Sequence, residues 1–216
     1  MQALPQSSLQ QATPLQPLLS LPKKEAIITP SQVNYVGKAV NLYDRGWQFH
    51  GSAAVIMRAL RMGYLWEHVR VRGGAYGAGC SLDRASGTLV CTSYRDPNVQ
   101  ETLASYDNMG QYLRQFKPDR VQLTQAIVGA VGDLDTYLLP DAKGARSLMR
   151  WLIHDTEEKR QQLREEMLGT TARDFALFGE VLESLKEGDV CVVGGTACEK
   201  IATDKGWAIS RLQQDS

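Results

Sequence analysis

The sequence predicts one α+β domain, in which helices pack on one face of an antiparallel sheet. Segments 33–42, 75–82 and 88–94 alternate between apolar and polar residues, a pattern typical of half-buried antiparallel strands. Other segments place apolar residues three and four positions apart, as helices with one apolar face do. Strands come first, then a run of helices, then strands again, and this order indicates an α+β arrangement.

The predicted strand over 33–42 is followed by a helix over about 52–69, which contains no proline. Four glycines between residues 73 and 79 make a continued helix costly. The following residues alternate as far as Asp96 and carry a turn at Ser86-Gly87, as two antiparallel strands would. The unit is therefore a helix followed by a hairpin.

The second half of the chain is mainly helical until its last 30 or so residues. Asp96-Pro97-Asn98 is a turn and helix-start signal. The predicted helices cover about 102–116, 120–137, 140–153, 156–166 and 171–186. A strand over 190–193, a short helix and a strand over 207–210 complete the predicted fold.

Three segments carry a resemblance to a known family. They are VNYVGKAVNLYD (33–44), LWEHVRVRGGAYGAGCSLDRASGTLVCTSYRDPN (65–98) and YLLPDAKGARSLMRWL (137–152). Together they resemble the C-terminal domain of presequence proteases, a peptide-degrading branch of the pitrilysin family of zinc metallopeptidases. The resemblance runs from about residue 28 to the C-terminus. It implies a clamshell of two halves, whose chamber admits short unfolded peptides and excludes folded proteins.

Arg70 and Tyr76 are the candidate catalytic residues. Both side chains donate hydrogen bonds and arginine is always charged, so together they suit the negative oxygen that forms when water attacks a peptide carbonyl. The resemblance implies this role, because the family's Arg-x5-Tyr spacing matches these two positions. The alternative is structural: a salt bridge at a helix end for Arg70 and ordinary packing for Tyr76. Arg72 competes with Arg70, since alternation would put both on one face of an extended segment.

Small residues beside this pair predict a substrate-binding surface. Gly73, Gly74 and Ala75 would let another backbone approach closely, as binding of an extended peptide requires. Asn34 begins the first predicted strand, which would pair with substrate if it lay at the sheet edge. Pairing within the sheet is the simpler alternative for that strand.

The zinc motif of the resembled family is missing from this chain. That motif is His-x-x-Glu-His, with two histidine ligands and a glutamate general base. The nearest match is YLWEH, in which Tyr64 replaces the first histidine, so Glu67 and His68 alone are not expected to hold zinc. We therefore expect no metal or other cofactor in this chain, and zinc in the full-length enzyme.

Composition excludes several other functions. The chain of 216 residues is 43% hydrophobic, so it can bury a core. It carries 24 basic and 24 acidic residues, so it has no net charge with which to attract nucleic acid. It has no run of about 18 apolar residues, so no membrane span is predicted. VCVVGGTACEK (190–200) begins like a phosphate loop but lacks a full nucleotide motif, and a tight strand-to-helix turn explains it equally.

The four cysteines, at 80, 91, 191 and 198, show no Cys-x-x-Cys spacing. They predict reduced thiols in a reducing compartment. Cys80 and Cys91 lie on neighbouring predicted strands, where a disulfide between them is the less favoured alternative.

The first 22 residues contain four prolines and no charge, which indicates a linker rather than a transit peptide. We expect a linker over 1–27, a domain over 28–216, and a Met1 that lies within a longer polypeptide.

These observations predict the C-terminal domain of a zinc metalloendopeptidase that degrades short unfolded peptides. Its expected partners are the N-terminal catalytic half of the same enzyme and the peptide substrate, so this chain alone would be inactive. The alternative is a free-standing, non-catalytic domain that binds peptides or scaffolds an assembly. We expect a soluble protein, in the mitochondrial matrix or chloroplast stroma if the organellar role of the family holds, and otherwise in the cytoplasm.

Overall fold

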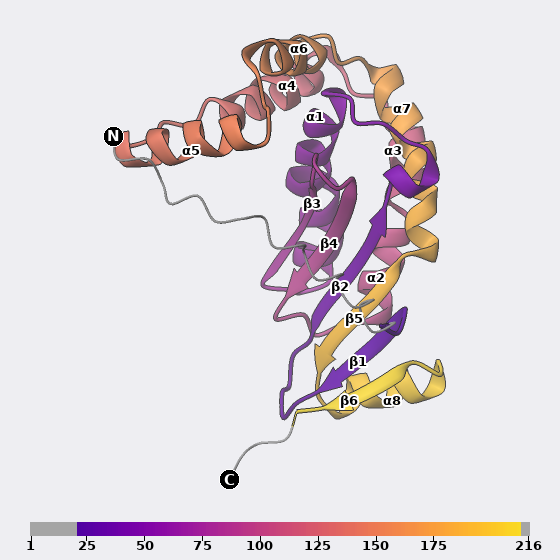
Figure 1. Cartoon of the computed structure of the whole chain (residues 1–216). Coiled ribbons are helices and arrows are strands. Elements are labelled where there is room, and N and C mark those ends of the chain that lie inside the picture. The colour runs from indigo at the N-terminus through magenta and orange to yellow at the C-terminus, as the bar shows by residue number, and fades with distance from the viewer. Residues whose placement is uncertain (1–20, 213–216) are drawn as a thin grey trace, which may run out of the picture.

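The computed structural model describes residues 21–212, which form a six-stranded sheet with helices packed against it (Figure 1). The strand order across the sheet is β3-β4-β2-β5-β1-β6. The strands are β1 (Lys24–Ile28), β2 (Tyr35–Asn41), β3 (Gly77–Leu82), β4 (Thr88–Tyr94), β5 (Asp189–Gly194) and β6 (Ala208–Arg211). The predicted α+β class is confirmed, and the hairpin of β3 and β4 follows the helix as expected.

The sheet is mixed rather than wholly antiparallel. The strands expected to be antiparallel, β2, β3 and β4, are so, and β2 also pairs antiparallel with β5. No strand was predicted at β1, which runs parallel to both β5 and β6. This strand begins at Lys24, within the last residues of the expected 1–27 linker, and its five residues are too few to show a clear alternation. Residues 1–20 of that linker lie outside the described part of the chain.

The helices follow the predicted segments, but three of the predicted helices, including the one over 171–186, are each divided into two segments. They are α1 (Ser52–Ala59), α2 (Gln100–Asp107), α3 (Met109–Gln115), α4 (Arg120–Leu134), α5 (Pro140–Leu152), α6 (Glu157–Leu168), α7 (Ala172–Val181) and α8 (Thr196–Asp204), with short 3₁₀ segments η1 (Tyr43–Arg45) and η3 (Leu182–Glu187). The helix expected over 52–69 continues from α1 as a π-helical segment, η2 (Leu60–Arg72). The single helix expected over 102–116 is two helices that meet at Asn108.

The main core lies between one face of the sheet and the helices. Val36 and Val192 on adjacent strands, Leu65 on η2 and Phe175 on α7 are all at most 1% exposed. Cys198 of α8 belongs to the same cluster, so α8 covers this face as well. A smaller cluster, formed by Val55, Ala130 and Met167, holds α4 and α6 against the outer side of α1. The helices therefore cover one face of the sheet, as predicted.

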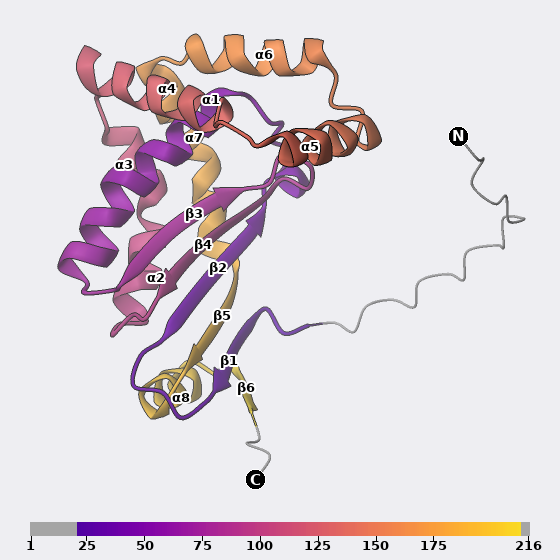
Figure 2. The same cartoon turned by 90° about the vertical axis from the view of Figure 1, so that its left-hand side faces the viewer.

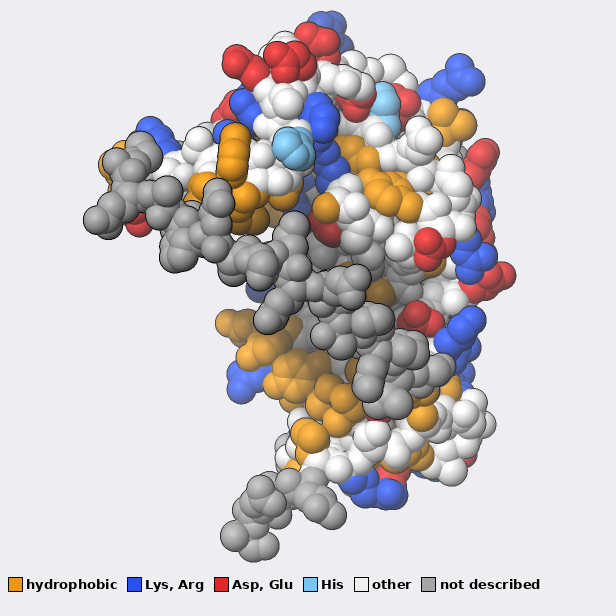
Figure 3. Space-filling view, viewed as in Figure 1, with side chains coloured by type: hydrophobic (Ala, Val, Ile, Leu, Met, Phe, Trp, Pro, Cys, Tyr) orange, Lys and Arg blue, Asp and Glu red, His pale blue; other side chains and the backbone are white. Residues whose placement is uncertain are grey.

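Among residues 21–212, no helix packs along the strands on the opposite face of the sheet (Figure 2). Paired residues on adjacent strands point to the same side, so Gly37, Thr92 and Cys191 share this face, which we call the open face. Thr92 and Cys191 are exposed. Hydrophobic side chains, orange in Figure 3, gather on the molecule beside the lower ends of β2, β3 and β4.

Helix α5 extends away from α3 and α7 (Figure 1) and carries an exposed apolar face. Leu148, Met149, Trp151 and Leu152 are 55–73% exposed, and Ile153 directly after the helix is 62% exposed. An exposed patch of this kind is more often an interaction site than free surface. No helix in residues 21–212 combines the length and apolar character that crossing a bilayer requires.

Candidate functional site

Tyr76 lies at the start of the hairpin, on the open face of the sheet. Its side chain is 68% exposed, and its ring packs edge-on against Tyr94 with centroids 5.9 Å apart. Tyr94 in turn packs edge-on against Tyr35 at 5.3 Å. These three side chains, which we call the tyrosine row, come from two neighbouring strands and the loop before β3. The phenol of Tyr76 is therefore held by ring contacts and remains open to a ligand.

Arg70 lies in the last turn of η2, with its guanidinium 3.9 Å from the centre of the Trp66 ring. In residues 21–212, no carboxylate lies within ion-pair distance of Arg70. Stacking fixes the plane of a guanidinium and leaves its N–H donors at the edge. Arg70 is half-buried, so its donors are available for an acceptor that the domain itself does not supply.

Arg72 differs from Arg70 in both position and partner. The expectation that the two share one face of an extended segment is wrong, because both lie in the helical segment η2 and residues two apart on a helix point to nearly opposite sides. Arg72 forms an ion pair with Glu67 at 2.8 Å. Its charge is thus already balanced by a neighbour on the same helix.

Arg95 is a neighbour of the tyrosine row, and the sequence pattern SYRDPN suggested for it a structural role at the strand-to-helix corner and no chemistry. Its guanidinium carbon is 6.0 Å from the centre of the Tyr94 ring, and its carbonyl accepts a hydrogen bond from the Tyr76 amide at 3.3 Å. Arg95 also has φ = 49°, an unusual value for a residue with a side chain. The structure brings Tyr76 together with Tyr94 and Arg95, whereas none of the contacts described within residues 21–212 joins Tyr76 to Arg70.

The small residues between η2 and β3 have local structural reasons to be small. A Cβ atom at Gly73 would lie 2.5 Å from the Val69 carbonyl oxygen, and Gly74 has φ = 78°. Ala75 is 3% exposed and belongs to the core, so its methyl group does not line the surface. Gly74 is exposed. These residues set the position of Tyr76 relative to η2, and their predicted contact with substrate stays a prediction.

Asn34 is 5% exposed, and its hydrogen bonds join the loop before β2 to the turn after β4. Its backbone exchanges two hydrogen bonds with that of Asp96, each 2.8 Å long. The Asp96 carboxylate accepts bonds from the Asn98 amide and the Thr102 hydroxyl. Strand β2 pairs on both sides, which confirms the simpler alternative, pairing within the sheet, and excludes an edge strand over 33–42. The edge strand near the candidate site is β3.

The residues of YLWEH do not fit a zinc site. Tyr64 donates its hydroxyl to the Ser105 carbonyl at 2.9 Å, and burial raises the pKa of Tyr64 to about 12, with Tyr112 adding to the effect. The His68 ring stacks on Tyr64, and its Nδ1 lies 2.9 Å from the Tyr64 carbonyl oxygen. Glu67 is paired with Arg72. Across residues 21–212, three or more His, Cys, Asp or Glu side chains nowhere come together as metal ligands would.

The purified chain is expected to hold no stoichiometric zinc, because its nearest candidate ligands already bond within the domain. Elemental analysis of protein prepared without an affinity tag and dialysed against micromolar zinc checks this. One tightly held zinc per chain would contradict it.

The remaining sequence candidates have structural roles. The four cysteines are free thiols, and burial raises the pKa of Cys80 to about 12, so this thiol stays protonated. Cys80 and Cys91 are register partners, as their predicted strands suggested. In VCVVGGTACEK, a Cβ at Gly194 would collide with the Asn34 side chain and one at Gly195 with the Ser31 carbonyl. That turn is packed against the loop before β2, which explains both glycines without a nucleotide.

Comparison with known proteins agrees with this fold. The sequence model of the PreP C-terminal domain family matches residues 24–197. Presequence protease 1, chloroplastic/mitochondrial, from Arabidopsis thaliana is 47% identical over 175 residues, which cover 81% of this chain and 16% of that protein. The chain thus spans about a sixth of that curated relative.

Two solved structures share the fold at low sequence identity. A peptidase M16 inactive domain from Pseudomonas fluorescens superposes with a TM-score of 0.60 at 14% identity, covering 88% of this chain and 45% of that one. Pitrilysin superposes with a TM-score of 0.54 at 13% identity, covering 79% of this chain and 19% of that one. Both are consistent with the family match over 24–197. The chain therefore belongs to the family of presequence-protease C-terminal domains.

Proposed function

We propose that this domain supplies substrate contacts and transition-state donors to a zinc metalloendopeptidase that degrades short unfolded peptides. The observation that carries the proposal is the position of Tyr76, whose side chain is 68% exposed and packs against Tyr94 on the open face instead of inside the core. Arg70 supports it, because its guanidinium is oriented by Trp66 and has no acidic partner in the described residues.

In the proposed reaction, Arg70 and Tyr76 donate hydrogen bonds to the oxygen of the peptide carbonyl as it becomes negative. Such donors stabilise the transition state more than the neutral carbonyl, and therefore raise the rate. The N-terminal half of the enzyme would hold zinc and a general base, which activate the attacking water. Gly74 and the free edge of β3 would position the peptide backbone beside these donors.

The proposed partner is the N-terminal half of the same enzyme, which would close over the open face. The length of the curated relative supports this, since this chain covers only 16% of it. The exposed apolar face of α5 supplies a surface for that contact, with Leu148 and Trp151 57% and 73% exposed. The relative's name places it in chloroplasts and mitochondria, and we propose the stroma or matrix for this chain. The four free thiols suit such a reducing compartment.

A hybrid enzyme tests the proposal. The C-terminal domain of the Arabidopsis relative is replaced by this chain, and cleavage of an unstructured fluorogenic peptide is measured. Activity within about tenfold of the unaltered relative is expected for the hybrid, and none for the isolated chain, because the metal and base lie in the other half. A folded, zinc-loaded hybrid without activity would contradict the proposal.

The free edge of β3 favours one alternative, a domain that binds peptides without cleaving them. In that case the isolated chain would bind unstructured peptides as tightly as the hybrid does, and the hybrid would release no product. Fluorescence anisotropy of a labelled peptide separates the two functions.

A further inference from the structure

A cavity lies on the helix-covered side of the sheet, away from the tyrosine row. We propose that it binds a phosphate group. The cavity is about 490 Å³ in volume. Its lining residues, which we call the lysine pocket, are Lys24, Lys38, Gln100, Leu103, Ala104, Asp107, Lys186, Val190, Lys205 and Trp207. This proposal does not depend on the peptidase function.

Strand register places two of the lysines level with each other, on the strands that flank β5. Lys24 on β1 and Lys38 on β2 both pair with Val190 of the intervening strand β5. Register partners point to the same face of a sheet, and adjacent strands are about 4.8 Å apart, so the two lysine backbones are about 10 Å apart. Both side chains therefore enter the pocket from the helix-covered face. Flexible lysine side chains that start from these two positions can reach one phosphate group from opposite sides.

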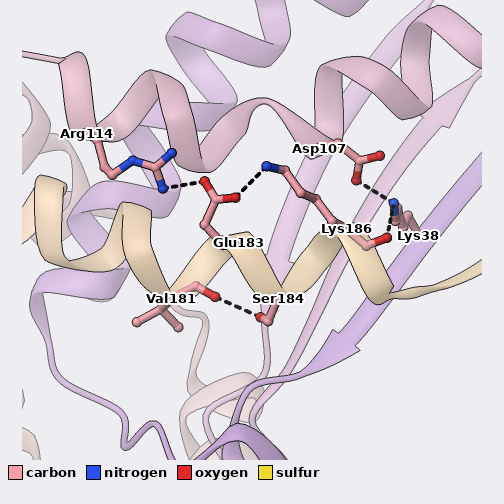
Figure 4. A network of polar contacts seen from close by, with 7 residues as sticks. All are labelled: Lys38, Asp107, Arg114, Val181, Glu183, Ser184 and Lys186. Carbon is pink, nitrogen blue, oxygen red and sulfur yellow. Dashed lines mark hydrogen bonds and ion pairs between the residues drawn. The ribbon is translucent and has the colours of Figure 1, made fainter.

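Lys38 forms the floor of the pocket. It is 5% exposed, and its ammonium donates to Asp107 at 2.5 Å and to the Lys186 carbonyl at 3.5 Å. Figure 4 shows these two acceptors on either side of the Lys38 amine, one from α2 and one from η3. An ammonium group has three N–H donors. The third has no described protein acceptor and is available to a ligand in the pocket.

The charges that line the pocket do not cancel. The ammonium of Lys186 is already paired with Glu183, which also binds Arg114 (Figure 4). Lys24 and Lys205 form no ion pair within residues 21–212. Lys24, Lys38 and Lys205 thus face a single carboxylate, that of Asp107, which leaves an excess of two positive charges. A phosphate dianion would neutralise this excess, whereas one carboxylate would not.

The remaining wall of the pocket is apolar and suits the organic part of a phosphate ester. The half-buried Trp207 side chain lines the cavity with Leu103 and Val190. The cavity is several times larger than a phosphate ion, which occupies a volume of the order of a few waters, each about 30 Å³. The shared recognition element is the phosphate group, supplied either by a phosphate monoester or by inorganic phosphate.

The test is a titration of the purified 216-residue chain at low ionic strength, followed by ¹H–¹⁵N NMR. The probes are phenyl phosphate, inorganic phosphate and benzoate, whose ring matches that of phenyl phosphate but which carries one negative charge. Phenyl phosphate is expected to shift the Lys38, Asp107 and Trp207 signals with a Kd of about 1 mM or tighter. Equal affinity for inorganic phosphate would identify the free ion as the ligand, and weaker affinity a monoester.

Matched lysine variants test the location of the site. Lys24→Gln and Lys205→Gln each remove one exposed cation and are expected to weaken binding of phenyl phosphate about tenfold. Lys200→Gln, an exposed lysine on α8 outside the pocket, makes the same charge change and is expected to have no effect. Lys38→Met is expected to abolish binding, and its thermal unfolding is measured alongside to detect a folding defect.

Three results would overturn the phosphate site. The first is no saturable shift of the pocket signals up to about 10 mM phenyl phosphate, which corresponds to a binding free energy weaker than about 3 kcal/mol. The second is an equal loss of affinity in Lys200→Gln and Lys205→Gln, which would indicate non-specific attraction to the surface. The third is benzoate binding as tight as that of phenyl phosphate.

Discussion

Replacing Arg70 by alanine in the hybrid enzyme is expected to lower kcat/KM for an unstructured peptide by about 10²-fold, the usual effect of removing one donor to a developing oxyanion. Tyr76→Phe is expected to have an effect of the same order, because it removes only the hydroxyl and keeps the ring contact with Tyr94. The measurement is steady-state cleavage of a fluorogenic peptide. Zinc content and thermal unfolding are expected to stay unchanged, because both side chains lie outside the core.

Two arginine variants are matched controls for this prediction. Arg72→Ala is expected to change kcat/KM less than about threefold, since Arg72 is exposed and is paired with Glu67 on its own helix. Arg95→Ala tests the guanidinium that the structure places next to Tyr94. A larger loss for Arg95→Ala than for Arg70→Ala would transfer the donor role to Arg95. A larger loss for Arg72→Ala would show that the Arg-x5-Tyr spacing was misapplied.

Elements fixed by local pattern were predictable from the sequence. Strand β4 alternates over its whole length and was expected with the bounds that the structure gives it, 88–94. The turn before it was also expected, and Gly87 there has φ = 73°, a conformation that glycine adopts at little cost. Helix α5 begins with Pro140 at its first position, a signal that needs no tertiary contact. In these cases nearby residues alone determine the backbone.

Features that depend on distant segments were not predictable in this way. Strand β1 exists because β5 and β6, more than 150 residues further along the chain, pair with its backbone on both sides. The chain bends at Asn108, after which α3 approaches α7 so closely that a Cβ at Gly110 would lie 2.6 Å from the Gly179 carbonyl oxygen. The sequence does not show that Gly110 and Gly179 lie where the two helices meet. Such contacts appear only once the chain is folded.

The candidate site shows the same division. The sequence placed Tyr76 at the start of the hairpin, and the structure confirms that position. It did not show that Tyr35 and Tyr94 pack beside Tyr76, because strands 50 residues apart had first to be put in register. A partial signal was available: Tyr94 is on the same strand face as Thr92, two residues before it. Alternation thus indicates which way Tyr94 points, but it does not indicate which residues lie beside it.

Phe175→Ala is expected to lower the free energy of unfolding by about 4 kcal/mol, because it leaves a large cavity where α7 meets the core. Phe175 is fully buried, and its ring lies 5.4 Å from that of Phe116, which follows α3. The measurement is equilibrium unfolding of the chain in urea. Leu177→Ala on the same helix is the matched control: Leu177 is 46% exposed, and a loss below about 1 kcal/mol is expected. Equal losses for the two variants would show that α7 is not docked on the sheet through Phe175, and the packing described for the helix-covered face would then be wrong.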